Sequence, residues 1–307
     1  MTTDTSTDLT ADLSPEEMLA RIRRLQIRAR RLVRLLFLGE YHSVFRGRGL
    51  EFSEVREYLP GDEVRLIDWN VTARMNVPYI KKYVEERELV LYLLVDVSAS
   101  SSFSSTAGTK RELGAELATL LAFAADANND KTALIAFSDR IEAYQPPKKG
   151  QQHVLRIARE LLYLRPKGRG TDITVATDFL MRVTKRPCVA FLISDFYARG
   201  YEGSLRLASR KHDFTAISLT DPRELELPRA GLVRLRDAES GADMLIDTED
   251  RGERERYAQS AAAAVATRRR VLAGLGVDEI PLRTDRSYVQ PLMTYFRQRA
   301  SRRRVAT

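Results

Sequence analysis

The sequence is poor in the residues that disulfides and soft-metal sites require. Its 307 residues include one cysteine, Cys188, and three histidines. A single cysteine excludes an intramolecular disulfide, and it also excludes a zinc site built from several thiolates. Chains without disulfides are typical of a reducing compartment. Because Cys188 lies within an apolar run, we expect an inert core thiol.

Long apolar runs are lacking as well. A strongly apolar run such as residues 89–95 falls far short of the ~18–20 residues that a membrane-spanning helix needs. Residues 1–13 are polar and acidic, without the basic and apolar regions of a signal peptide, and we expect them to form a disordered tail. These absences predict a cytoplasmic protein, with a peripheral position at the inner membrane face left open.

Positive charge is confined to the two ends of the chain. Lys and Arg number 50 against 42 Asp and Glu, which gives a net charge of +8. Residues 21–35 hold seven Arg and no acidic residue, and residues 297–307 hold five more Arg. These twelve Arg exceed the net charge, so the rest of the chain sums to −4. The protein is therefore a mildly acidic body with two basic ends.

The first basic end is predicted to be an amphipathic helix. Ser14, Pro15 and Glu17 match a capping box with proline at the first helical position, and apolar residues recur at helical spacing as far as residue 38. Its arginines have three interpretations: a face in solvent or against an acidic protein, a contact with anionic lipid, or a contact with nucleic acid. We favour the first, and nucleic acid is least favoured because no DNA-binding motif is present.

Strands and helices alternate through the middle of the chain. Residues 89–95 form a continuous apolar run, which is typical of a strand buried on both faces of a parallel sheet. This alternation predicts an α/β fold with a doubly wound, mostly parallel sheet. The other expected strands are 80–88, 132–137, 140–144, 188–194 and 213–219, and the expected helices are 110–128, 151–164, 171–184 and 204–211.

The C-terminal part of the chain has a different pattern. It predicts a β-hairpin from residues 232–237 and 243–247, a long helix over 249–275, a short strand at 279–282 and a final helix after 288. We interpret these pieces as additions to the α/β core rather than as a second domain. The predicted organisation has four parts: a disordered tail at 1–13, an N-terminal helix and β elaboration packed on the core at 14–88, the core at 89–221, and the hairpin with the C-terminal helices at 222–307.

Oxygen-bearing side chains follow the predicted buried strand. Asp96, Ser98 and Ser100 come directly after it, so three oxygens can turn toward one point. In open α/β sheets the functional crevice lies at the carboxyl ends of the strands. Thr171, on a glycine-containing loop, and Asp195, at the end of a later buried strand, are placed to join them. Oxygen ligands suit a hard cation such as Mg²⁺, although the same residue types also form caps and turns.

This pattern resembles the metal-ion-dependent adhesion site of von Willebrand factor type A domains. The resemblance lies in Asp-x-Ser-x-Ser, a Thr on a glycine loop and an Asp that closes a strand, in that order. It implies a von Willebrand factor A fold and a bound Mg²⁺, with Mn²⁺ as the alternative ion, held directly or through water. It also implies an open coordination position for an Asp or Glu of a partner. The implied metal ligands are Asp96, Ser98, Ser100, Thr171 and Asp195.

A longer resemblance covers residues 40–250. Residues 52–69 read FSEVREYLPGDEVRLIDW, and with residues 146–150, 194–196 and 221–224 they are similar to a bacterial family catalogued as domain of unknown function 58. Many of its members carry membrane spans before this region, so this sequence looks like the short soluble branch. That branch implies a partner system, a MoxR-type AAA+ ATPase, for which this protein would be an adaptor that recruits client proteins.

Within this stretch, Arg56, Arg65, Trp69 and Arg74 have two interpretations. In the first, Trp69 is buried and Arg–Asp pairs clasp the N-terminal region to the sheet. In the second, the same residues form a surface for a partner, since Trp and Arg are common anchors of interfaces. We favour the clasp and keep the partner surface as the alternative.

Motifs of catalysis are absent. The nucleophile elbow, the zinc-protease motif and the complete phosphate-loop motif do not occur, and residues 108–110 are better interpreted as a helix cap than as a fragment of a phosphate loop. His42, His153 and His212 stand at no recognisable spacing to the candidate loops. The predicted function is therefore a non-enzymatic, Mg²⁺-dependent protein-interaction module. The alternatives are a metal-dependent phosphoester hydrolase, and a basic protein that binds a membrane surface or nucleic acid.

Overall fold

The computed structural model describes residues 15–33, 51–84, 89–106, 108–236, 239 and 241–305. The predicted disordered tail, the end of the arginine helix beyond residue 33, and His42 lie outside the described residues. The chain divides into two compact units, of which residues 45–89 form the smaller and the rest of the chain the larger. The elaboration predicted at 14–88 is therefore divided between the two units.

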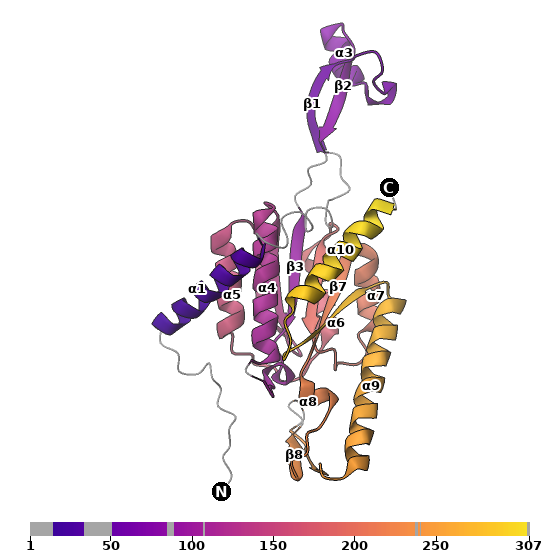
Figure 1. Ribbon diagram of the computed structural model, residues 1–307. Helices are drawn as coiled ribbons and strands as arrows, with labels where there is room; N and C mark the ends of the chain where they lie inside the picture. Colours follow the sequence, from indigo (N-terminus) through magenta and orange to yellow (C-terminus); the bar gives the residue numbers. More distant parts are fainter. Residues whose placement is uncertain are drawn as a thin grey trace. The chain divides into compact units, whose positions relative to one another are not determined.

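A six-stranded sheet forms the centre of the larger unit (Figure 1). From β3 the chain moves outward through β4 to β5, then returns to the other side of β3 and moves outward through β6 and β7 to β10. All neighbouring strands are parallel except β4 and β5. This is the doubly wound order 3-2-1-4-5-6, and the predicted α/β fold with a doubly wound, mostly parallel sheet is confirmed. The order across the sheet is β10 (Asp278–Arg283), β7 (Asp213–Thr220), β6 (Val189–Ser194), β3 (Val90–Asp96), β4 (Lys131–Phe137) and β5 (Ile141–Lys148).

The strands form from apolar runs that the sheet buries on both faces. Every residue of β6 is buried, as is every residue of β3 and β4 after the first. The antiparallel edge strand β5 is partly exposed, and Pro146 and Pro147 occur there. Proline cannot donate to a strand ladder, so the edge is the position that tolerates it.

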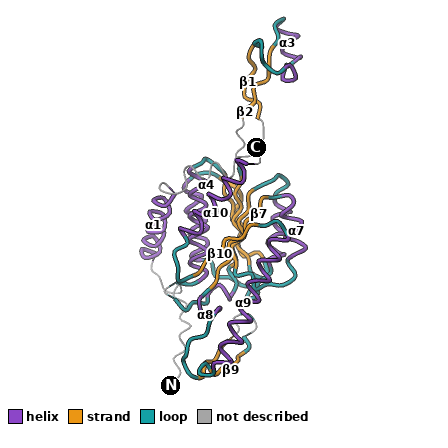
Figure 2. The backbone as a smooth tube through the Cα atoms, turned by 45° about the vertical axis from the view of Figure 1, so that its right-hand side comes forward, coloured by secondary structure: helices purple, strands orange, loops and turns teal. Residues whose placement is uncertain are grey.

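Helices cover both faces of this sheet (Figure 2). Leu94 and Leu192 share a core with the helices of one face. Val95 and Ile193, the next residues of the same strands, face α4, where a Cβ at Gly114 would lie 3.8 and 3.6 Å from them. The sheet therefore has an apolar core on each side. The helices of the first face are α6 (Ile173–Val183), α7 (Glu202–Lys211) and α9 (Arg251–Gly274), and those of the second are α4 (Lys110–Ala127), α5 (Gln151–Tyr163) and α10 (Val289–Val305).

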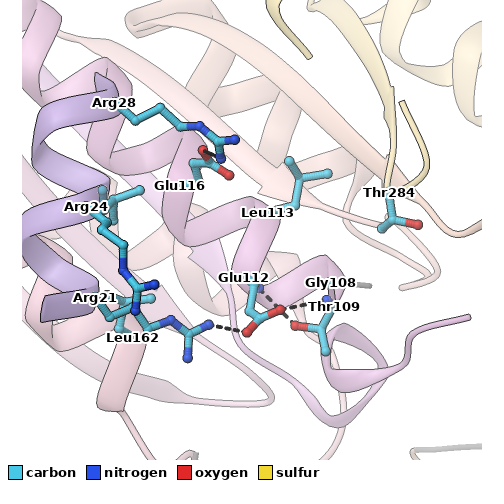
Figure 3. Close-up of a pocket in the computed structure, with 11 residues that line it drawn as sticks. Arg21, Arg24, Arg28, Gly108, Thr109, Glu112, Leu113, Glu116, Leu162 and Thr284 are labelled. Carbon is cyan, nitrogen blue, oxygen red and sulfur yellow. Dashed lines mark hydrogen bonds and ion pairs between the residues drawn. The ribbon is translucent and has the colours of Figure 1, made fainter. Parts of the chain in front are cut away.

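The arginine helix is α1 (Pro15–Leu32), which packs on α4 and α5. Arg21 forms an ion pair with Glu112, and Arg28 Nη1 lies 2.8 Å from Glu116 Oε1 (Figure 3). These four residues line a pocket of about 570 Å³ between α1 and α4. Part of the basic face is therefore used to hold the helix on the core. None of the described helices combines the length and the apolar character required to cross a bilayer.

The C-terminal elements differ in one respect from the sequence interpretation. β10 pairs in parallel with β7 and is the sixth strand of the sheet, so the core continues beyond residue 221. The strand predicted at 279–282 is therefore present, and its place at the sheet edge tolerates Pro281. The predicted hairpin is present as β8 (Leu232–Arg236) and β9 (Asp243–Asp247), and it is preceded by α8 (Pro222–Leu225).

The smaller unit is an antiparallel strand pair that carries a short helix. Arg56 holds Asp62 through two hydrogen bonds of 2.9 and 2.7 Å. Trp69, however, is 68% exposed, so the interpretation that it is buried in a clasp is wrong. Trp69 begins a seven-residue helix that has no buried residue, so the helix supplies no apolar core against which the indole ring could pack. The elements of the unit are β1 (Glu51–Glu57), the 3-10 helix η2 (Val64–Leu66), α3 (Trp69–Met75) and β2 (Tyr79–Val84).

Leu94→Ala tests the core between the sheet and α6, α7 and α9. Leu94 is fully buried in the central strand, so its truncation leaves a cavity, and we expect the free energy of unfolding to fall by about 2–5 kcal/mol. Leu207 on α7 is 62% exposed, and Leu207→Ala should change that free energy by less than about 0.5 kcal/mol. Urea denaturation followed by circular dichroism measures both variants, and equal effects would contradict this packing.

Candidate metal centre at the carboxyl edge of the sheet

The chain reverses its direction of winding between β3 and β6. These strands are parallel neighbours, with Val95 paired to Ile193. β3 ends at Asp96, and Asp195 directly follows the last residue of β6. After β3 the chain passes to α4 on one face, and after β6 it passes to α7 on the other. The two carboxylates therefore lie at the kind of crevice in which doubly wound sheets bind ligands.

Asp96 is fixed by hydrogen bonds to both of its carboxylate oxygens. The Ser98 N–H donates to Oδ1 at 2.9 Å, and the Ser194 hydroxyl donates to Oδ2 at 2.6 Å. Asp96 is only 5% exposed. Burial, and after it the negative charge of Asp195, raises the pKa of Asp96 to about 6 from an ordinary value of 3.8. A cation beside the two carboxylates would offset both effects.

Three hydroxyls connect the two carboxylates. Ser100 Oγ donates to Asp195 Oδ2 at 2.9 Å. Ser98 Oγ lies 3.1 Å from Ser100 Oγ, and Thr171 Oγ1 lies 2.8 Å from Ser98 Oγ. Because the N–H of Ser98 also holds Asp96, the structure brings all five predicted metal residues together, from three separate loops.

Thr171 reaches this group because its loop approaches a neighbouring loop closely. A Cβ at Gly168 would overlap Ser138 Oγ and Asp139 Oδ1, so a larger residue there would force these side chains to move. The N–H of Ala99 donates to the carbonyl oxygen of Arg169 at 3.1 Å, which ties this loop to the one that carries Ser98 and Ser100. Gly168, three residues before Thr171, therefore has a steric role.

The chain turns sharply after Asp195. Phe196 has φ of 61°, in the left-handed region that favours glycine, and this conformation costs roughly 1–2 kcal/mol. The residue is buried, and its N–H donates to Ser194 Oγ at 3.1 Å. The N–H of Tyr197 donates to Asp195 Oδ1 at 3.2 Å. This turn holds Asp195 toward the crevice, and no sequence signal indicates it, because an aromatic residue disfavours this conformation.

A buried lysine, which the sequence analysis did not place in the site, neutralises Asp195. Lys110 is 1% exposed, and its Nζ lies 2.6 Å from Asp195 Oδ2 and 2.5 Å from Glu224 Oε1. Burial by itself would lower the pKa of Lys110, but the charges of Asp195 and Glu224 outweigh it and raise the pKa. The predicted helix cap is confirmed, since Thr109 forms a capping box with Glu112. The ion pairs of Lys110, the residue after Thr109, have no local signal in the sequence, because Asp195 and Glu224 are distant from it in the chain.

A further carboxylate, which the sequence analysis also missed, lies beside Thr171. Glu239, from the turn between β8 and β9, accepts a hydrogen bond through Oε1 from Thr171 Oγ1 at 2.6 Å. The carboxylates of Asp96, Asp195, Glu224 and Glu239 and the ammonium of Lys110 thus lie in one part of the molecule. A divalent cation would be attracted to these carboxylates.

The donor oxygens are spaced as the ligands of one small cation. Mg²⁺ takes oxygen ligands in octahedral geometry at about 2.0–2.1 Å, which puts neighbouring ligands roughly 2.9 Å apart. The separation is 2.8 Å between Thr171 and Ser98 and 3.1 Å between Ser98 and Ser100. Asp195 already accepts hydrogen bonds from Tyr197, Ser100 and Lys110. The residues therefore fit Mg²⁺ or Mn²⁺, with Asp195 suited to a contact through water.

The described histidines and the cysteine have structural positions. His153 Nε2 lies 2.9 Å from the carbonyl oxygen of Thr132, and His212 Nδ1 lies 3.2 Å from Cys188 Sγ. Burial raises the pKa of the Cys188 thiol to about 12, so the thiol is inert, as predicted. Across the part of the chain that the structure describes, no three His, Cys, Asp or Glu side chains converge as ligands of a metal ion.

Comparison with known sequences finds one matching family and several close relatives. The family described as "Protein of unknown function DUF58" matches residues 54–267. Uncharacterized proteins of Mycobacterium tuberculosis and Mycobacterium bovis are each 33% identical to this chain over 301 residues, which is 97% of this chain and 94% of theirs.

Solved structures that resemble this chain are more distant in sequence. The conserved hypothetical protein BatB from Bacteroides thetaiotaomicron is 16% identical over 69% of this chain and 99% of its own, with a TM-score of 0.43. An aerotolerance-related membrane protein from Bacteroides fragilis, crystallised with multiple mutations to serines, is 15% identical over 70% of this chain and 99% of its own, with a TM-score of 0.45.

Lys110→Met tests the buried ion pair. The substitution leaves the carboxylates of Asp195 and Glu224 without their cation, and we expect it to lower the free energy of unfolding by about 3–5 kcal/mol. Lys185 is an exposed lysine, and Lys185→Met should have little effect. Urea denaturation in EDTA measures both variants without compensation by a metal ion. A Lys110→Met protein as stable as the Lys185→Met control would show that the pair does not hold Asp195.

Proposed function

The chain belongs to the DUF58 family, and from the geometry of its candidate metal centre we propose that it is a Mg²⁺-dependent protein-interaction module. The observation that carries this proposal is the convergence of five oxygen-bearing side chains at the switch point of the sheet. These are the residues that the sequence pattern assigns to the ion: Asp96, Ser98, Ser100, Thr171 and Asp195.

The proposed mechanism needs little rearrangement of the chain. The bound ion supplies positive charge to which an Asp or Glu of a partner binds. Ser194 and the N–H of Ser98 orient Asp96 toward the crevice, and Lys110 holds Asp195. Because these contacts exist before a partner arrives, the site is preorganised, which lowers the entropic cost of binding.

The alternative function, a metal-dependent hydrolase, has less support from the site. Metal-assisted hydrolysis needs a positioned base or a second metal. His153 and His212 are buried against other elements, and all four carboxylate oxygens of Asp96 and Asp195 accept hydrogen bonds. These features support binding rather than turnover.

The partner that we propose, on the family resemblance, is a MoxR-type AAA+ ATPase that works with this chain as its adaptor. A surface of the smaller unit supports contact with a protein: Trp69 lies exposed, as do Arg65 and Arg74. Trp and Arg are the residues that most often anchor interfaces. The exposed apolar side chains of this unit further include Leu59, Val64, Met75 and Val77.

Titration calorimetry with Mg²⁺ and Mn²⁺ tests the metal site. We expect one ion to bind per chain, and Asp96→Ala to weaken its binding at least about tenfold, because the variant loses a carboxylate of the donor set. Asp126→Ala, at the far end of α4, is the matched control and should bind the ion as the wild type does. Failure of the wild type to bind either ion would overturn the proposed function.

Biolayer interferometry with an immobilised MoxR-type ATPase tests the partner. Binding of the wild-type chain should fall at least about tenfold when EDTA replaces Mg²⁺, because the bridging ion is lost. Trp69→Ala should weaken binding by a comparable factor if the smaller unit contributes an anchor, whereas Leu207→Ala, an exposed apolar residue on α7, should leave it unchanged. Equal binding in EDTA and in Mg²⁺ would contradict a metal-dependent contact.

A further inference from the structure

The hydrogen bond between Thr171 and Glu239 brings a carboxylate of the same chain to the candidate metal centre. Glu239 Oε1 lies 2.6 Å from Thr171 Oγ1. The other oxygen of Glu239 faces the same loop, since a Cβ at Gly170 would lie 3.9 Å from Oε2. Glu239 is exposed to solvent on its outer side. Its carboxylate therefore turns inward although the residue belongs to a surface turn.

This contact fixes the direction of the Thr171 hydroxyl. A hydroxyl has one proton and an ionised carboxylate can only accept, so Thr171 donates to Glu239. In its 2.8 Å contact with Ser98 Oγ, Thr171 Oγ1 is then the acceptor, so its lone pairs face that side. Glu239 thus leaves Thr171 able to act as a ligand. Its own oxygen also extends the row formed by the hydroxyl oxygens of Thr171, Ser98 and Ser100.

The row of oxygens that results has the spacing of adjacent ligands of one cation. Its successive separations are 2.6 Å from Glu239 to Thr171, 2.8 Å from Thr171 to Ser98 and 3.1 Å from Ser98 to Ser100. Adjacent ligands of octahedral Mg²⁺ lie roughly 2.9 Å apart. A carboxylate oxygen is also a ligand that this ion readily takes.

The hairpin that carries Glu239 has a fixed base and exposed arms. At the base Thr248 is buried, accepts a hydrogen bond from the N–H of Ala230 at 2.9 Å and donates to the carbonyl oxygen of Gly231 at 2.7 Å. The exposed side chains of the arms include Leu232, Met244 and Leu245.

We propose that Glu239 is the chain's own carboxylate ligand of the metal centre, and that it occupies the position that an Asp or Glu of a partner takes. This inference rests on the proposed function, because it requires the ion. In the absence of a partner Glu239 occupies this position, and a partner carboxylate binds by displacing the carboxylate of Glu239.

The test uses Mn²⁺ as the probe, with the full chain and the variants Glu239→Gln, Glu249→Gln and Asp96→Ala. Glu249 is an exposed neighbour of the same hairpin and serves as the matched control. Calorimetry gives the affinity for Mn²⁺, and water-proton relaxation gives the number of water molecules on the bound ion. Glu239→Gln should bind Mn²⁺ about tenfold more weakly and should carry one additional water, while Glu249→Gln should match the wild type.

The outcomes separate this inference from the proposed function. If Asp96→Ala loses Mn²⁺ binding while Glu239→Gln equals the wild type in affinity and in bound water, Glu239 is not a ligand and the inference is overturned, although the metal site stands. If the wild type binds no Mn²⁺, both are overturned. A weaker Glu239→Gln protein with an unchanged water count would also overturn the inference, because the loss would then come from a change in charge alone.

Discussion

The reversal of winding between β3 and β6 is the constraint on which the candidate site depends. Because the two strands are parallel neighbours, their carboxyl ends meet at one edge of the sheet. The segments that follow them leave for opposite faces, so a crevice opens between the two ends. Asp96 and Asp195 face each other there although they are far apart in the sequence. The remaining loops only have to add hydroxyls, and the glycine at position 168 allows the loop of Thr171 to approach.

The buried charged side chains are the second constraint, and they determine how positive and negative charge are distributed over the site. Lys110 neutralises Asp195 from the side of α4, with Glu224 as its second partner. Asp96 receives only neutral donors, from Ser98 and Ser194. On the side of Asp96 and Thr171, Glu239 adds a further carboxylate. A cation placed there would gain the most electrostatic stabilisation.

The features that could be predicted from the sequence are those with local signals. The apolar run of β3 is followed directly by Asp96, Ser98 and Ser100, while Thr171 and Asp195 lie in two later segments. The fold class follows from the alternation of strands and helices, and the five candidate ligands follow from the order of these three segments and from the family resemblance. Lys110 and Glu239 were missed because each acts through a residue distant in sequence. The strand β10 was predicted at 279–282, but it was interpreted as an addition to the core because its pairing with β7 joins segments about 65 residues apart and has no local signal. The exposure of Trp69 depends on the size of the core of the smaller unit, which no local pattern reveals.

Anomalous diffraction from crystals of the full chain grown in Mn²⁺ shows directly whether one divalent cation lies among these oxygens. We expect a single strong manganese peak at bonding distance, about 2.0–2.3 Å, from oxygens of Asp96, Ser98 and Thr171. No peak at this position in a saturated crystal, or a strong peak at another group of side chains, would contradict this expectation.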